Sequence, residues 1–471
     1  VHISRNSSEI ISGVTRKVTI ATQIIMQCLT ALSALILFIF FISVLLIAEP
    51  FIAIISFVVI GFSYSIVSFF VKRSLMINSN IESNGQNSVI KILQEGLGGI
   101  REVILENLQN VYSDKYRSFD GPMREASGKN LFIAASPRFI IEAVGIVLIA
   151  LLALYFNNTE LGIKGYLPIL GALALGAQRL LPSIQQGYAA WSSISGSAAS
   201  FSDAINLLEQ KLPDEINPTD SIIPFNDSIS VQNLSFRYSS SNKGAINNIS
   251  FDVKKGSKIA FVGSTGSGKS TLLDLLMGLL SPQSGSINVD GRLINNVQEW
   301  RNSFAHVPQD IFLLDADFTE NISFGNKHKI SESKIKKAAS DACILEDIES
   351  KPEKFKTQLG ERGVKISGGQ KQRIGIARAL FKGTDILMLD EATSALDNIT
   401  EREILNNIVN HLPKTTIFMI AHRLSSIKNF DQILVIDNGK IIDKGNYDEL
   451  IENCPSFRKF AKDEKNNLNK E

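Results

Sequence analysis

Long uncharged apolar runs dominate the chain up to about Leu212, whereas shorter apolar segments mixed with charges follow it. Two of these runs, Cys28–Ala48 and Phe51–Val71, contain 21 residues each without a charge. Each run is long enough to cross about 30 Å of hydrocarbon as a helix. Soluble helices seldom continue this far without a charge, so we interpret both runs as membrane spans rather than buried core helices. Glu49-Pro50 between them predicts a tight turn on the outer side.

The pattern predicts two further spans. One is Leu131–Phe156, and the other begins near Gly165 and continues toward Leu208. The polar section of about 74–130 carries many Lys and Arg residues, which favours the cytoplasmic side, and its apolar spacing predicts helices that project beyond the bilayer. Four spans would return both ends of the region to the cytoplasm.

A polar stripe marks the fourth predicted span. Gln178 and Gln185 are seven residues apart, as are Arg179 and Gln186, so all four lie on one side of a helix. A charge inside a membrane normally faces a cavity or a partner. Arg179 could therefore touch an anionic substrate, or it could snorkel or pair structurally, for example with Glu142.

The segment GSTGSGKST has the composition of a phosphate-binding loop. It follows an apolar segment, Lys258–Val262, that reads as a strand, and precedes Thr271–Leu280, which reads as a helix; this context distinguishes it from a Gly/Ser-rich linker. Its glycines allow successive N–H groups to face one anion at a helix N-terminus. Lys269 would reach the β- and γ-phosphates, and the Ser270 hydroxyl would bind Mg²⁺. The predicted nucleotide-binding residues here are Gly263, Ser264, Thr265, Gly266, Ser267, Gly268, Lys269, Ser270 and Thr271.

A second phosphate-sized site is predicted at the start of a basic amphipathic helix. Its residues are Ser367, Gly368, Gly369 and Gln370. Their amides would bind an anion at the helix N-terminus. This second site cannot bind at the phosphate loop described above if a phosphate already occupies that loop.

Two apolar segments that read as buried strands end in polar residues suited to hydrolysis. Ile386–Glu391 ends in two carboxylates. Asp390 would hold Mg²⁺ through water, and Glu391 would orient or deprotonate the attacking water. Thr415–Ile420 is followed by Ala421 and His422, and His422 could contact the γ-phosphate. Each signal is weak alone, but their order after the phosphate loop favours a nucleotide hydrolase.

Composition and the positions of prolines predict the domain organisation. The net charge of +1 argues against a nucleic-acid partner, and the three cysteines are far apart with no metal-ligand spacing. Three prolines in the segment ending at Asp227 predict a linker. We expect a membrane domain at 1–212, a linker at 213–227, a cytosolic domain at 228–461 and a polar tail at 462–471.

These motifs, in this order, resemble the ATP-binding cassette (ABC) transporters of the exporter type. The resemblance implies an α-helical transmembrane domain followed by an α/β P-loop ATPase cassette, with ATP and Mg²⁺ as ligands. It implies that Tyr238 stacks on adenine and that Gln309 senses Mg²⁺ and contacts the membrane domain. Ser270, Gln309 and Asp390 would then surround the metal. The usual LSGGQ signature begins here with Ile366, which keeps an apolar residue.

The resemblance also implies an assembly. Exporters of this type have six spans per half-transporter, so about two N-terminal helices and one intracellular loop would be absent from this sequence. The signature site of one cassette would close on ATP held by the phosphate loop of another. With one cassette per chain, the implied partner is a second half-transporter, most simply a second copy.

The transported substrate is the least constrained expectation. The segments Ser136–Glu142 and Leu181–Ser183 are similar to bacterial flippases for lipid-linked oligosaccharides, which implies an amphipathic, anionic lipid or lipid-linked glycan. The implied location is a bacterial inner membrane with the ATPase domain in the cytoplasm. A peptide, drug or toxin exporter remains an alternative. A non-transport ABC ATPase is a second alternative, but it would normally lack fused spans such as Cys28–Ala48.

Overall fold

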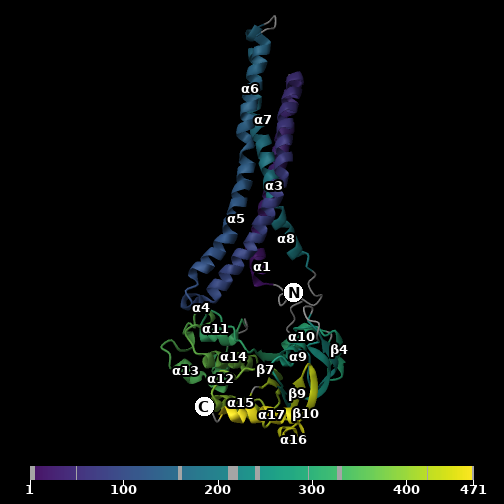
Figure 1. Cartoon of the computed structure of the whole chain (residues 1–471), viewed down its shortest axis with the longest axis vertical. Coiled ribbons are helices and arrows are strands. Elements are labelled where there is room, and N and C mark those ends of the chain that lie inside the picture. The colour runs from purple at the N-terminus through teal and green to yellow at the C-terminus, as the bar shows by residue number, and fades with distance from the viewer. Residues whose placement is uncertain are drawn as a thin grey trace. The chain divides into compact units, whose positions relative to one another are not determined.

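The computed structural model describes residues 6–48, 50–157, 162–210, 221–238, 244–294, 296–325, 331–421 and 423–468. The chain divides into two compact units, Val1–Lys211 and Leu212–Glu471 (Figure 1). The first unit is helical, and the second contains both helices and strands.

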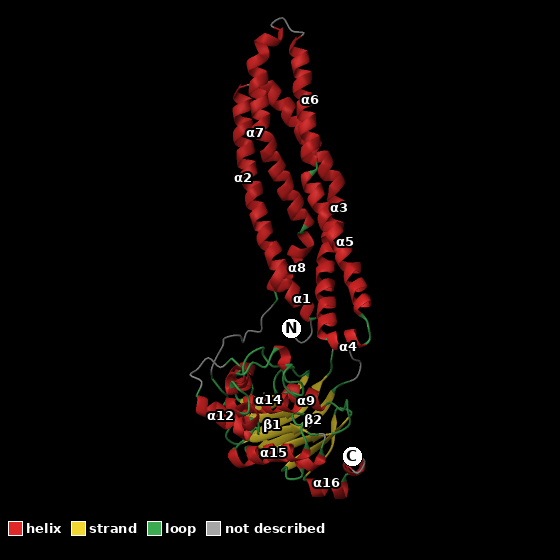
Figure 2. Ribbon diagram, turned by 90° about the vertical axis from the view of Figure 1, so that its left-hand side faces the viewer, coloured by secondary structure: helices red, strands yellow, loops and turns green. Residues whose placement is uncertain are grey.

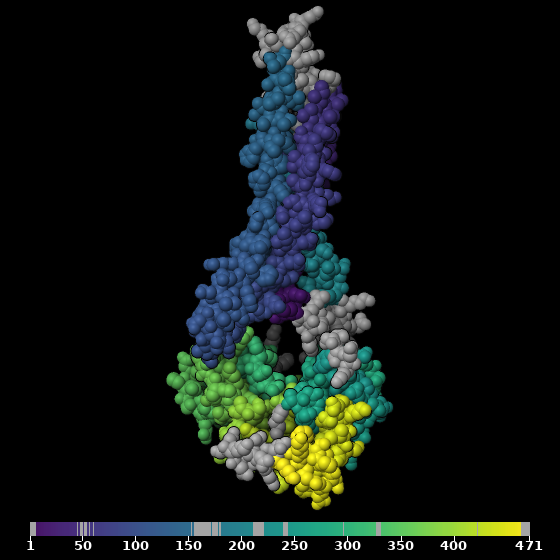
Figure 3. All heavy atoms as spheres, in the orientation of Figure 1, coloured from purple at the N-terminus to yellow at the C-terminus, as the bar shows by residue number. Residues whose placement is uncertain are grey.

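Long helices make up the first unit. α3 has 49 residues, which corresponds to about 74 Å at the helical rise and is much more than the hydrocarbon thickness of a bilayer. It packs along α5, as the space-filling view also shows, while α2 packs along α7 (Figure 3). The elements are α1 (Ser7–Ser12), a π-helix (Gly13–Lys17), α2 (Val18–Ala48), α3 (Pro50–Gly98), α4 (Ile100–Leu105), α5 (Gln109–Ala135), α6 (Pro137–Asn157), α7 (Gly162–Gly196) and α8 (Ala198–Leu208).

Three stretches in the described part of the chain are long and apolar enough to cross a membrane: Ser7–Val44, Phe57–Gly98 and Gln109–Leu151. They overlap the first three predicted spans. The fourth predicted span falls on α7, whose side chains at 162–170, 172–177 and 179 lie outside the described residues.

The helical unit exposes many large apolar side chains. Phe69 is 81% exposed, Phe70 is 75% exposed and Phe139 is 69% exposed. Apolar surface on this scale is unfavourable in water and favourable in hydrocarbon. The composition of the helix surfaces therefore suits a bilayer.

An ion pair between a buried lysine and a partly exposed aspartate connects three helical segments of this unit. Lys17, at the end of the π-helix, is 4% exposed, and its Nζ lies 2.6 Å from Asp203 Oδ2 on α8. Ser83 on α3 donates to the same carboxylate oxygen at 2.6 Å. The Asp203 carboxylate offsets the cost of holding the Lys17 ammonium away from water.

Two sheets form the framework of the second unit. Within the described residues, an antiparallel sheet has the order β2-β1-β4-β5, and a larger sheet has the order β10-β9-β3-β8-β7-β6. The larger sheet is parallel except where β10 meets β9. The strands are β1 (Ser228–Phe236), β2 (Ile246–Lys254), β3 (Lys258–Val262), β4 (Ser284–Val289), β5 (Arg292–Leu293), β6 (Phe304–Val307), β7 (Ile386–Asp390), β8 (Thr416–Ile420), β9 (Gln432–Asp437) and β10 (Lys440–Gly445).

Helices enclose these strands (Figure 2). They are α9 (Lys269–Leu276), α10 (Val297–Asn302), α11 (Phe318–Ser323), α12 (Glu332–Asp341), α13 (Leu345–Glu349), α14 (Gly368–Lys382), α15 (Asn398–His411), α16 (Tyr447–Asn453) and α17 (Pro455–Leu468). The predicted polar tail begins within α17, which Phe457 anchors in the core at 0% exposure.

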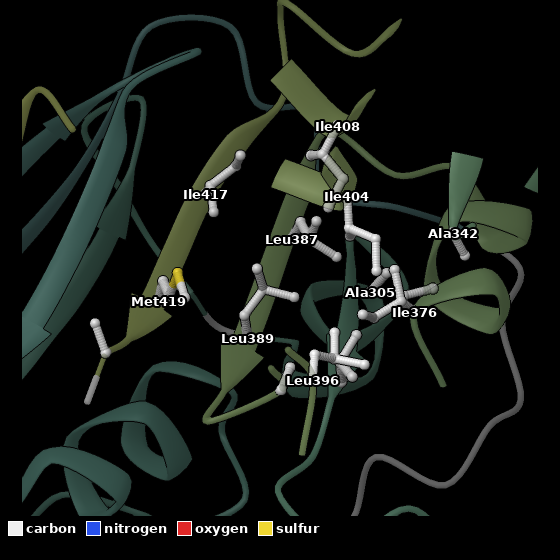
Figure 4. Close-up of a cluster of buried hydrophobic side chains, with 14 of the residues drawn as sticks. Ala305, Ala342, Ile376, Leu387, Leu389, Leu396, Ile404, Ile408, Ile417 and Met419 are labelled. Atoms are coloured by element: carbon white, nitrogen blue, oxygen red, sulfur yellow. The ribbon is translucent and has the colours of Figure 1, made fainter. Parts of the chain in front are cut away.

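The larger sheet separates two hydrophobic cores because successive strand residues face opposite sides. In β7, Leu387 and Leu389 point into one core with Ile404 of α15 and Ile376 of α14 (Figure 4), whereas Met388 joins the other core. The second core lies between the larger sheet, α9 and the antiparallel sheet. Strands buried on both faces are uninterrupted apolar runs, which is why Lys258–Val262 and Ile386–Glu391 are recognisable in the sequence.

Part of the predicted linker packs on the second unit. Phe225 is 3% exposed and belongs to the second core, and its carbonyl accepts a hydrogen bond from Lys255 Nζ at 2.6 Å. Ile223 N donates to Ser303 Oγ at 2.9 Å. Residues 211–220 of the predicted linker lie outside the described part of the chain.

His306 on β6 gives the second unit an acid sensitivity. Burial lowers the pKa of His306 to about 4, and its Nε2 has no hydrogen-bond partner among the described residues. The unfolded chain takes up this proton near pH 6.5, so this group's contribution to stability is complete above that pH and is lost as the pH falls toward 4. We expect a loss of about 2 kcal/mol at pH 5 relative to pH 7.

Thermal unfolding of the full-length protein in detergent at pH 7 and pH 5 measures this effect. His306→Gln should flatten the difference in Tm between the two pH values relative to the wild-type protein. An unchanged pH dependence in His306→Gln would contradict the assignment.

Candidate nucleotide site

The phosphate loop connects β3 to α9 and has no room for side chains at two of its glycines. A Cβ on Gly263 would lie 2.1 Å from Ile436 O, and one on Gly268 would lie 2.7 Å from Ala245 O. Gly268 also has a φ of +108°, which glycine adopts without strain. The turn thus requires glycine for steric reasons, and its backbone approaches neighbouring strands closely.

Lys269 begins α9 and is folded into the loop. It is 6% exposed, and its Nζ donates to Gly263 O and Ser264 O at 2.9 Å each. Burial lowers the pKa of Lys269, and the charges of Glu391 and Asp390 act in the opposite direction. The ammonium group is therefore held at the loop and lies within the electrostatic field of both carboxylates.

The loop fits a polyphosphate. No side-chain cap satisfies the N-terminus of α9, because Gly268 occupies the capping position. Ser267 is 3% exposed, and its Oγ has no hydrogen-bond partner within the described residues. A buried hydroxyl, free helix amides and a lysine at one turn are the donors that a phosphate chain accepts from.

The predicted carboxylates lie at the end of β7. Glu391 follows the strand with a φ of +49°, and its Oε2 accepts a hydrogen bond of 2.8 Å from Gln309 Nε2. Both Asp390 and Glu391 are half-buried, whereas Gln309 is exposed. The structure thus brings Gln309, Glu391, Asp390 and Lys269 into one region.

Three residues of the predicted site have side chains of the kind that bind a divalent metal. Ser270, Gln309 and Asp390 offer a hydroxyl, an amide oxygen and a carboxylate, which are the hard oxygen donors that Mg²⁺ prefers together with phosphate and water. When bound, Mg²⁺ would neutralise phosphate charge. Its binding here remains a prediction.

Tyr238 lies beside the end of the phosphate loop. Its hydroxyl is 3.3 Å from Thr271 Oγ1, its ring packs edge-on against Phe236 with centroids 4.9 Å apart, and it is 40% exposed. A partly exposed ring anchored at its edge can offer a face to a flat base. Adenine stacking on Tyr238 stays a prediction.

The predicted second phosphate site forms the N-terminus of α14. Ser367 Oγ accepts from Gln370 N at 3.2 Å, and Gln370 Oε1 accepts from Ser367 N at 3.1 Å, which makes a capping box. Gln370 Nε2 also donates to Asp347 Oδ1 at 2.8 Å. The Gln370 side chain is thus engaged within its own unit, and in the described part of the chain no hydrogen bond joins this site to the phosphate loop. His422 lies outside the described residues.

Sequence reasoning missed two buried polar residues near the site. Gln372 is 5% exposed, and its amide donates to Ser394 Oγ at 2.9 Å and accepts from Ala395 N at 2.8 Å. Glu401 is 4% exposed and accepts from Thr393 Oγ1 at 2.8 Å. The spacing of Glu401 with the apolar residues three and seven positions later was the available signal, because it places a charge on the core face of a helix.

The predicted polar stripe is only partly described. Gln178 and Gln186 are exposed, and Gln185 is half-buried and donates to Glu142 Oε1 at 3.4 Å. Glu142 also accepts from Arg138 Nε at 2.9 Å, so its described partners are Arg138 and Gln185. The Arg179 side chain lies outside the described residues, and its two interpretations stay open.

Comparisons with known proteins decide the family. The sequence profile of the family described as ABC transporter matches residues 246–394. An ATP-dependent lipid A-core flippase from Photobacterium profundum is 32% identical over 405 residues, which covers 85% of this chain and 68% of that protein. The chain belongs to the ABC transporter family.

The chain is also similar to a glucan export protein and to a solved exporter structure. A beta-(1→2)glucan export ATP-binding/permease protein, NdvA, from Agrobacterium vitis is 36% identical over 329 residues, which covers 69% of this chain and 54% of that protein. A bacterial Atm1-family ABC exporter, solved with ATP bound, has the same fold with a TM-score of 0.84 and 24% identity, covering 98% of this chain and 81% of that one. The chain is thus an integral-membrane half-transporter of the exporter type with an ATP-hydrolysing cassette.

Removal of the Lys269 ammonium tests its contact with phosphate. Lys269→Ala should weaken binding of a fluorescent ATP analogue by about 10- to 100-fold, because a charge-assisted hydrogen bond to phosphate is lost. Exposed Lys254→Ala is the matched control and should bind normally. Equal affinity of the two variants would remove Lys269 from the site.

Proposed function

We propose that this ABC half-transporter is an ATP-driven flippase that moves an amphipathic, anionic lipid or lipid-linked glycan across a bacterial inner membrane. The likeness to a lipid A-core flippase carries the proposal, because it extends over 405 residues. This is longer than the whole Leu212–Glu471 unit, so the likeness continues into the membrane helices, where the cargo has to pass.

The nucleotide site supports the energy source. In our proposal Lys269 and the loop amides bind the β- and γ-phosphates, and Ser270, Gln309 and Asp390 hold Mg²⁺. Glu391 orients or deprotonates the attacking water, and His422 contacts the γ-phosphate. Fixed donors in a site from which water is excluded stabilise the charge that develops during hydrolysis.

The site is completed by a second half-transporter, which we propose to be another copy of this chain, with the cassettes in the cytoplasm. Ser367 is exposed at the start of α14, and the hydrogen bonds of its side chain and amide stay within that helix. The capping box occupies the amides of Ser367 and Gln370, so a phosphate bound by the other copy would meet the amides of Gly368 and Gly369 at this helix N-terminus. Closure around two ATP molecules would favour one arrangement of the membrane helices over the other.

The cargo contacts are proposed on α7 and its neighbour α6. Gln178, Arg179, Gln185 and Gln186 would form a polar stripe for an anionic headgroup. Gln185 already contacts Glu142, which shows that polar side chains from the two helices meet in this region. A polar path between apolar helices suits a substrate with a charged head and an apolar tail. The relationship to NdvA favours a second candidate cargo, a glycan without a lipid.

Glu391→Gln tests the proposed base. The variant should bind ATP normally but lose at least about a hundredfold in ATPase rate, because the amide cannot accept the proton of water. ATPase activity and ATP-analogue affinity are measured on the same full-length preparation, with Glu353→Gln as the exposed control. Wild-type turnover in Glu391→Gln would overturn the assignment.

Reconstitution into liposomes tests the cargo. We expect lipid-linked oligosaccharide to stimulate ATPase activity and to be flipped in an ATP-dependent manner. Arg179→Ala should reduce flipping about tenfold, which is the loss expected for one charge-assisted contact, with basal ATPase retained. Exposed Arg124→Ala is the matched control.

The outcomes separate the candidates. Stimulation and transport by a lipid-free glucan, without flipping of the lipid-linked glycan, would favour the second cargo. Normal flipping by Arg179→Ala would return Arg179 to a structural role.

A further inference from the structure

Glu401 is a buried carboxylate that the hydrolysis scheme above does not use. It lies in the first turns of α15, is 4% exposed, and shares a helix face with the core residues Ile404 and Ile408. A carboxylate at a core position is costly unless several donors compensate for the lost water. An apolar side chain would fill this position without the desolvation cost of a charge, which suggests that the charge has a function.

Three donors surround the Glu401 carboxylate. Oε1 accepts from Thr393 Oγ1 at 2.8 Å and from Ser426 Oγ at 2.6 Å. Oε2 accepts from Arg423 Nη1 at 2.8 Å. Such a fully satisfied network fixes the groups that it connects, because a shift of any donor would leave a buried charge unpaired.

The donors come from two different loops. Thr393 is two residues after Glu391 at the end of β7, whereas Arg423 and Ser426 follow β8, the neighbouring parallel strand. Arg423 Nη1 also donates to Leu396 O at 3.1 Å, so it holds the first loop as well. In the sequence Arg423 directly follows His422, the residue predicted to contact the γ-phosphate.

The loop after β7 needs such support. Glu391 has a φ of +49°, a left-handed conformation that is strained for a residue with a Cβ and persists only when the surroundings fix it. Two successive turns follow, closed by Ser394 N to Glu391 O at 3.1 Å and by Leu396 N to Thr393 O at 3.1 Å. Gln372 holds Ser394 and Ala395 from the side of α14. Glu401, on α15, holds Thr393 by the hydrogen bond from its hydroxyl.

We propose that Glu401 is a positioning residue for ATP hydrolysis. Its carboxylate fixes the turn that carries Glu391 in register with the loop that begins after β8. The inference rests on the proposed role of Glu391 and is independent of the cargo. It predicts that loss of the Glu401 charge slows the chemical step without weakening ATP binding, because the phosphate loop is held by other contacts.

Glu401→Gln, compared with Glu403→Gln on the exposed face of the same helix, tests the proposal. In the full-length protein we expect the kcat of Glu401→Gln to fall at least about tenfold, with KM for ATP and ATP-analogue affinity within about twofold of wild type. The amide retains the size of the side chain but presents an N–H₂ group to hydroxyl and guanidinium donors. Glu403→Gln should match wild type in all three quantities.

Thr393→Val provides a second test that retains side-chain volume and removes one donor to Glu401. Its kcat should fall less than that of Glu401→Gln, and the double variant should lose no more than Glu401→Gln alone, since both changes act through one network. Losses of kcat that multiply in the double variant would contradict the network. Losses of kcat that are fully explained by a reduced folded fraction, measured from Tm and ATP-analogue binding, would also contradict it.

Glu391→Gln measured alongside separates this inference from the proposed function. If Glu391→Gln is inactive and Glu401→Gln has wild-type kcat, the role of Glu401 is wrong and the base assignment stands. If Glu391→Gln keeps wild-type kcat, the base assignment is wrong and the premise of the inference falls with it.

Discussion

The parallel register of the larger sheet is the constraint on which the nucleotide site depends. β3 pairs with β8, and β8 pairs with β7, each in parallel, so their carboxyl ends lie at one edge. The phosphate loop follows β3, the two carboxylates follow β7, and Arg423 follows β8. A one-residue slip would move each side chain of these strands from one hydrophobic core into the other, so the packing of the two cores fixes the register and, through it, the chemistry.

Steric and electrostatic requirements reinforce each other within the phosphate loop. The backbone at Gly263 approaches Ile436 O too closely for any Cβ, so only glycine fits where the loop leaves β3. Burial of Lys269 in the same turn lowers its pKa, while the field of Glu391 and Asp390 opposes that change. The loop thus holds a cation at a place where a phosphate chain adds the missing negative charge.

The two units solve the burial of polar groups differently. In the cassette, Gln372 and Glu401 hold the loop after β7 from two sides, and Arg423 connects that loop to the one after β8. In the helical unit, Lys17 and Ser83 share the Asp203 carboxylate, while large apolar side chains such as Phe69 face outward. Membrane helices can expose apolar surface to lipid. Polar contacts in this unit therefore mark helix–helix interfaces and not the boundary with water.

The sequence by itself determined the features that depend on neighbouring residues. A phosphate loop needs contiguous glycines between a strand and a helix, and a span needs an unbroken apolar run, so Gly263–Thr271 and Cys28–Ala48 were readable directly. Tertiary structure alone decided which distant residues meet. Gln309 contacts Glu391 across 82 positions, and Glu401 contacts Ser426 from a neighbouring loop. These pairings follow from the strand order β3-β8-β7-β6, which differs from the order along the chain, so no local pattern records them.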